Sequence, residues 1–144
     1  MNTSRKSEKG QALILIALGL VVLIGFTALA IDGGNIYAER RRAQNAADTT
    51  VLDAALAKAR GGNLATLRSE GLQRAASNNF NDTDADFGQS NPDVNVEIYN
   101  PPISGTYAGQ SEYVQVFITN KIKTFFSGII GRSNKQNYMV KTVT

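Results

Sequence analysis

A long uncharged stretch near the amino terminus limits this chain more than any other feature of its sequence. From Gln11 to Ile31 no residue carries a charge, and only Gln11 and Thr27 are neither apolar nor glycine. At about 1.5 Å per residue, a helix over this run is roughly 31 Å long, which matches the hydrocarbon thickness of a bilayer. We therefore predict a membrane-spanning helix over residues 11–31.

Basic residues lie on both sides of the predicted span. Arg5, Lys6 and Lys9 precede it, and cationic flanks tend to stay in the cytoplasm. The sequence therefore predicts a single-pass protein of the cytoplasmic membrane, with residues 1–10 inside and the C-terminal module outside. The basic cluster Arg40–Arg42 beyond the span opposes this orientation, because it places comparable charge on the other side.

The apolar run has three alternative fates. A secretory signal would be cut after Ala30, but its apolar core is longer than such signals usually have. A type IV prepilin would be cut after Gly10, which would leave Gln11 as the first residue of the mature chain. In that family the fifth residue of the mature chain is normally a glutamate that neutralises the amino terminus of a neighbouring subunit, and here that residue is Leu15. A retained anchor needs nothing that the sequence lacks, and we favour it.

Composition limits what the roughly 110 residues outside the span can do. The 144-residue chain has no cysteine and no histidine, which removes thiolate nucleophiles, disulfides and histidine-based metal sites or triads. Its net charge of +3 is dispersed after the first ten positions, so we expect no nucleic-acid partner. We predict a module that is not an enzyme and holds no cofactor.

Residue spacing beyond the span predicts more helix. Asp32 marks the aqueous boundary, and Gly33 and Gly34 offer a hinge. An alanine-rich helix is expected within residues 32–62, ended by Gly61–Gly62, and Asn63 can cap a second helix over residues 64–77. The apolar stripe of the first of these helices recurs at helical intervals and comprises Ile36, Ala43, Ala47, Val51 and Ala54.

The rest of the chain alternates in the manner of strands. Residues 94–98, 114–118 and 137–144 have this pattern, and Thr124 can cap a short helix over residues 125–130, with one phenylalanine ring in the core. The predicted fold class is α+β: a long N-terminal transmembrane helix continues into a small module, residues 63–144, of helices on a short antiparallel sheet. The order is helix, helix, strand, strand, helix, strand, as in pilins.

An acidic stretch contains a damaged calcium-loop pattern. Aspartates occupy its ligand positions, but Phe87 stands where the loop's sharp turn needs glycine. We keep a calcium site only as a candidate and favour an exposed acidic loop. Its ligands would be Asp82, Asp84, Asp86 and Asp93.

Residues 10–59 resemble the N-terminal segment of TadE/TadG-like proteins of the tight-adherence (Flp) pilus system. The matching pieces are Gly10-Gln11 before the span, Ala30-Ile31-Asp32-Gly33-Gly34 at its exit, Tyr37, Arg40-Arg41-Arg42, and Ala43-Gln44-Asn45-Ala46-Ala47-Asp48. The resemblance implies a membrane-anchored pilus component, a minor subunit or assembly factor, whose partners are other pilus or pilus-assembly proteins. The alternative is a filament-forming, pilin-like subunit at the cell surface, a homo-oligomer whose apolar helices bundle in the fibre core.

The stripe and the resemblance together give residues expected to serve helix packing or assembly. They are Gln11, Leu15, Asp32, Gly33, Gly34, Ile36, Tyr37, Ala43, Asn45, Ala47, Asp48 and Val51.

Overall fold

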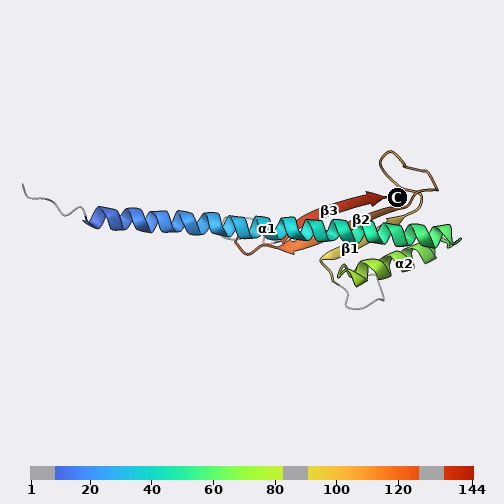
Figure 1. Cartoon of the computed structure of the whole chain (residues 1–144), viewed down its shortest axis with the longest axis horizontal. Helices are drawn as coiled ribbons and strands as arrows, with labels where there is room; N and C mark the ends of the chain where they lie inside the picture. The colour runs from blue at the N-terminus through green and yellow to red at the C-terminus, as the bar shows by residue number, and fades with distance from the viewer. Residues whose placement is uncertain (1–8, 83–90, 127–134) are drawn as a thin grey trace, which may run out of the picture.

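A single long helix dominates the computed structural model, which describes residues 9–82, 91–126 and 135–144. Helix α1 covers Lys9–Ala59, 51 residues, and is therefore about 76 Å long. It passes through Gly33 and Gly34 without interruption, so the structure has no hinge there. Its first half projects away from the rest of the protein, as Figure 1 shows, and all residues from Gly10 to Thr27 are exposed.

This projecting half is the candidate membrane span. Within the described residues, α1 is the helix that is long and apolar enough to cross a membrane, and only 6% of its most apolar 18-residue window is buried. A core helix of a soluble protein would be mostly covered by its own chain. The predicted long, apolar N-terminal helix is confirmed.

Helix α2, Leu64–Ser77, folds back beside the end of α1. Gly61 has φ +85°, a conformation that favours glycine, and the chain reverses there. The predicted cap is confirmed, because the side chain of Asn63 accepts a hydrogen bond from the backbone N–H of Thr66 at 3.0 Å. The short connection between the two helices therefore uses Gly61 to reverse the chain and Asn63 to cap α2.

The sheet is antiparallel and has three strands in the order β1-β2-β3. Strand β1 covers Val94–Tyr99, β2 covers Gln115–Lys123 and β3 covers Lys135–Val143. Val96 of β1 lies opposite Ile118 of β2, which in turn lies opposite Val140 of β3. The predicted α+β class with a small antiparallel sheet is confirmed.

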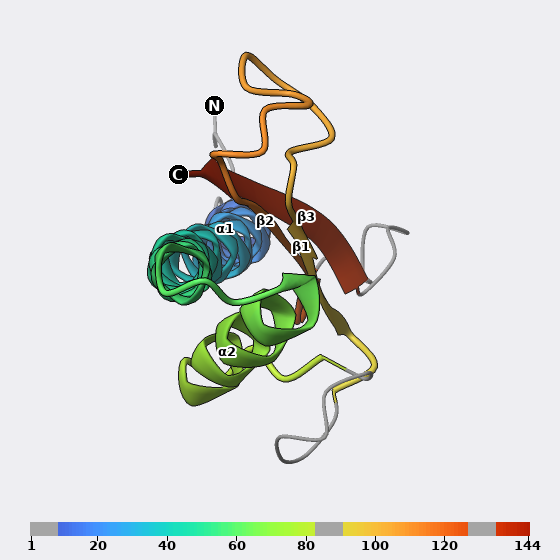
Figure 2. The same cartoon turned by 90° about the vertical axis from the view of Figure 1, so that its right-hand side faces the viewer.

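Both helices lie on one face of this sheet, as the end-on view in Figure 2 shows. Helix α1 contacts β2 and β3, and α2 contacts β1. We call the packed part of the protein, α1 from Ala28 onward together with α2 and the sheet, the head. Its core combines small residues of α1, residues in and just after α2, and branched residues in and next to the strands: Ala43, Ala46, Ala47, Val51, Ala54, Ala57, Leu67, Ala75, Phe80, Val94, Val96, Ile98, Val114, Val116 and Ile118.

The segment after β2 differs from the prediction. Phe125 and Phe126, the first residues of the expected helix at 125–130, are not helical, and the remainder of that helix lies outside the described residues. Neither ring is fully buried, since Phe126 is half-buried and Phe125 is 72% exposed. The backbone N–H groups of both residues contact α1, a contact that the sequence pattern does not show and that is described next.

Candidate functional site

Asp32, at the end of the apolar run, binds the backbone of the segment that directly follows β2. Its Oδ1 accepts the backbone N–H of Phe125 and its Oδ2 accepts that of Phe126, both at 2.9 Å, across 93 and 94 positions of sequence. Asp32 is buried although it follows the uncharged run directly. A carboxylate that accepts two backbone N–H groups satisfies both of them and ties this segment to α1.

The alanine-rich stripe of α1 lies inside the head. Ala43, Ala47 and Ala54 have no exposed surface and Val51 is 1% exposed, while Ile36 at the lower end is half-buried. Side chains this small allow the helix backbone to approach the sheet and α2 closely. The packing partner of the predicted stripe is therefore the protein's own sheet and second helix.

The remaining residues expected to serve assembly lie elsewhere on α1. Gln11 and Leu15 are exposed on the projecting half, and Gly33, Gly34, Tyr37 and Asn45 are exposed farther along. Asp48 is half-buried and accepts a hydrogen bond from Gln44 at 2.9 Å. The structure thus separates the expected set into an inward group, Asp32 with the stripe, and an outward group available to other molecules.

The outward side of α1 includes leucines that the sequence analysis did not select. Leu52 and Leu56 are 57% and 46% exposed, and they share a face with Asn45 and Thr49 because these positions are three or four residues apart. Large apolar side chains on the solvent side of a helix form a surface suited to another protein. Their helical spacing from Asn45 was visible in the sequence and is the signal that could have identified them.

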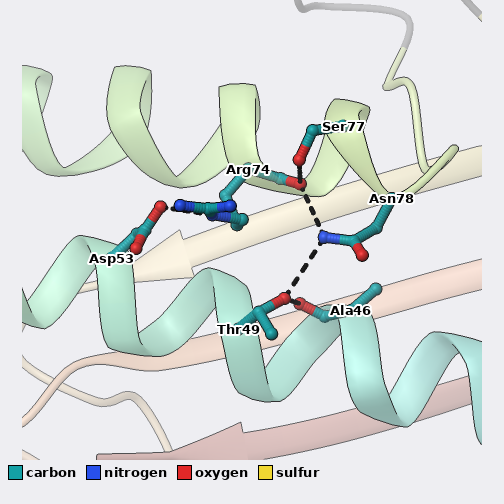
Figure 3. Close-up of polar contacts among 6 residues, drawn as sticks. All are labelled: Ala46, Thr49, Asp53, Arg74, Ser77 and Asn78. Atoms are coloured by element: carbon teal, nitrogen blue, oxygen red, sulfur yellow. Dashed lines mark hydrogen bonds and ion pairs between the residues drawn. The ribbon is translucent and has the colours of Figure 1, made fainter.

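A polar seam fixes α2 against α1, as Figure 3 shows. Arg74 donates to Asp53, and Asn78 donates to Thr49 Oγ1 at 3.3 Å and to the carbonyl of Arg74 at 3.0 Å. The hydrogen bond from Arg74 to Asp53, together with the negative charge of Asp53, raises the pKa of Arg74. Leu67 and Ala75, on the buried face of α2, lie in the core beside this seam.

The loop between β1 and β2 lies at the end of the head farthest from the projecting helix (Figure 1). The Asn100 side chain accepts from Lys58 at 2.8 Å and donates to the carbonyls of Ser111 and Tyr113. The rings of Tyr107 and Tyr113 stack with centroids 4.1 Å apart. The loop therefore has a defined shape and presents apolar surface, including Ile103 at 59% exposure.

The calcium candidates serve other roles or lie outside the described residues. Asp82 is buried, and its Oδ2 accepts the backbone N–H of Val96 at 2.9 Å. This bond gives a partner to a backbone N–H group of the edge strand β1. Asp93 accepts through its carbonyl from the N–H of Lys121 at 2.9 Å. Asp84 and Asp86 fall in the segment that is not described, and no metal-ligating group of His, Cys, Asp and Glu occurs among the described residues.

Comparison with known proteins gives one family. Residues 10–58 match the model of the Tad family, described as Flp pilus-assembly TadE/G-like. The matched segment coincides with α1, Lys9–Ala59, so it contains the candidate span, Asp32 and the alanine stripe. No curated protein and no solved structure matches the chain. The resemblance predicted from the sequence is confirmed over this segment.

Proposed function

We propose, from the TadE/G-like match over residues 10–58, that this protein is a membrane-anchored component of Tad/Flp-type pilus assembly. It acts as a minor subunit or assembly factor, through protein contacts outside the cytoplasmic membrane. The observation that carries the proposal is that the first half of α1 is apolar and bare, whereas its second half packs against the sheet and α2 in the head. Such a division suits a rod that holds a module at a membrane surface.

The chemistry of the head supports a contact role over a catalytic one. The sequence has no histidine or cysteine, and the aspartates that the structure describes in buried positions bind backbone amides. The surfaces left for partners are the outward side of α1 around Leu52 and the ordered loop around Ile103. Other pilus-assembly proteins are the expected occupants.

Photo-crosslinking in intact cells of the native host tests the partner claim. A photoreactive residue at Leu52 should give cross-links to other pilus-assembly proteins, identified by mass spectrometry. The matched control is the neighbouring Val51, which is 1% exposed and should give only links within the chain. Absence of any intermolecular product from Leu52, in cells that make the pilus, would contradict the proposal.

A filament-forming subunit is the second candidate function. It is favoured by the exposed apolar surface from Gly10 to Thr27, which would also fit a bundle of identical helices. It is opposed by Leu15, which stands where a pilin's charge-neutralising glutamate would be. Electron microscopy of sheared surface material separates the two: regular filaments built mainly of this chain would favour the subunit role.

Orientation is open to a direct test because the chain has no native cysteine. We expect Ile103→Cys to react with a membrane-impermeant maleimide in intact cells, since this residue is exposed on the head. Ser4→Cys, in the basic N-terminal segment, should react only after the cells are permeabilised. The reverse pattern would show that the head is cytoplasmic and would rule out assembly contacts outside the membrane.

A further inference from the structure

An exposed aromatic ring is held at the end of the candidate span. Phe125 is 72% exposed, and its backbone N–H is bound at 2.9 Å by the carboxylate of Asp32. The neighbouring N–H of Phe126 is bound by the other oxygen of the same carboxylate. The ring's position along α1 is therefore fixed by two hydrogen bonds.

The depth of this ring follows from the length of α1. Asp32 directly follows Ile31, the last residue of the uncharged run, and lies about 1.5 Å farther along the helix axis. Ala28, about one turn earlier, is also buried, so the head reaches back to the level of the last turn of the span. If residues 11–31 fill the hydrocarbon core, Phe125 lies at its boundary with the headgroups.

The surroundings of Phe125 suit this boundary. Phenylalanine is among the apolar residues that interfacial segments bury at the boundary between headgroups and acyl chains. Lys121 and Lys123 are exposed on the last part of β2, directly before the ring, and cations near a membrane surface attract anionic headgroups. Because α1 is continuous through Gly33 and Gly34, one uninterrupted helix joins the span to the head.

We propose that Phe125 is an interfacial anchor: its ring inserts into the bilayer beside the span and docks the head on the lipid surface. Asp32 is the positioning residue, because it sets the level of the ring through the backbone of Phe125. The occupant of this surface is lipid. The inference rests on the membrane span and is independent of a role in pilus assembly.

The chain contains no tryptophan, so Phe125→Trp introduces a single indole whose emission can be excited selectively over the tyrosines. The full chain is reconstituted into phosphatidylcholine–phosphatidylglycerol vesicles with bromine atoms at shallow acyl positions. The indole of Phe125→Trp should show blue-shifted emission and lose fluorescence relative to unbrominated vesicles. The exposed Ile103→Trp is the matched control and should show no loss of fluorescence. Ile103 is bonded to Gln115 at the start of β2, whereas Phe125 follows the end of this nine-residue strand, so the two sites are about 30 Å apart.

Each outcome of this experiment bears on the inference. Flotation with the vesicles but equal, unquenched emission from both variants would overturn the anchor while leaving the span and the pilus proposal intact. Failure of the chain to float with vesicles would overturn the span and the anchor together. Adding Asp32→Ala to Phe125→Trp should reduce the bromine quenching towards the Ile103→Trp level; undiminished quenching would refute the positioning role of Asp32.

Discussion

Removing the Asp32 carboxylate should release the segment after β2 from α1 while the rest of the head stays folded. Each of its oxygens accepts one backbone N–H at 2.9 Å, and a hydrogen bond to a charged group contributes about 1.5–3 kcal/mol. The sum of the two bonds is an upper limit, because the largely exposed segment at Phe125 can bond to water once the carboxylate is gone. We therefore expect Asp32→Ala to lower local stability by about 2–3 kcal/mol.

Amide hydrogen exchange measures this loss at the two groups concerned. In a chain labelled with ¹⁵N-phenylalanine and held in micelles, the loss corresponds to roughly 30- to 150-fold faster exchange at Phe125 and Phe126. Asp32→Asn should fall between, because its amide oxygen accepts a hydrogen bond and its amide nitrogen only donates. Asp48→Ala is the control, since that carboxylate accepts from the Gln44 side chain on the same helix. Unchanged exchange at both amides in Asp32→Ala would refute the reasoning.

Three further predictions concern the core, and urea denaturation of the head in micelles checks each. Thr50→Val should raise the free energy of unfolding by about 1 kcal/mol, because the Thr50 hydroxyl is buried without a hydrogen-bond partner in the described structure; a fall would show a hidden partner. Gly71→Ala should lower it by about 1–2 kcal/mol, since the new Cβ would lie 2.4 Å from Cδ1 of the buried Ile98 and overpacking outweighs the gain in helix propensity; a net gain would mean that Ile98 repacks. Ala47→Leu should lower the free energy of unfolding by about 1–3 kcal/mol, because Ala47 is fully buried. Leu52→Ala should lower it by under about 0.5 kcal/mol, because Leu52 is exposed. Similar effects at both sites would contradict the assigned inward face.

Local patterns in the sequence predicted most of the elements. The uncharged run, the cap at Asn63 and the alternation around Val96 and Ile118 each depend on residues close in the chain, and each is confirmed. Helical and strand periods are properties of a few consecutive residues, so they are visible without knowledge of the tertiary fold. The predicted hinge at Gly33 is absent, because glycine permits a bend but does not require one.

The contacts that define the candidate site could not be predicted in this way. Asp32 was predicted to mark the aqueous boundary and to serve helix packing or assembly, but nothing near it in sequence indicates that it binds the backbone of Phe125. Thr124 was expected to cap a helix, but the N–H groups after it are bound by Asp32. Polar side chains that bind distant backbone amides leave no periodic pattern, and their partners follow only from the assembled fold.

The family match over residues 10–58 covers a helix whose two halves have different surroundings: the first half is bare and the second packs in the head. The first half of this segment needs an apolar surrounding and the second half, with Ala43 and Ala47 at its centre, needs a closely packed cover. In this protein the sheet and α2 supply that cover, so the stripe is already occupied and is not open to a partner helix. The exposed apolar surfaces that the structure describes outside this packed face include the bare span, the outward leucines, Ile103 and the ring of Phe125. The segment that the family model matches therefore supplies both the candidate span and the helix on which the sheet and α2 pack.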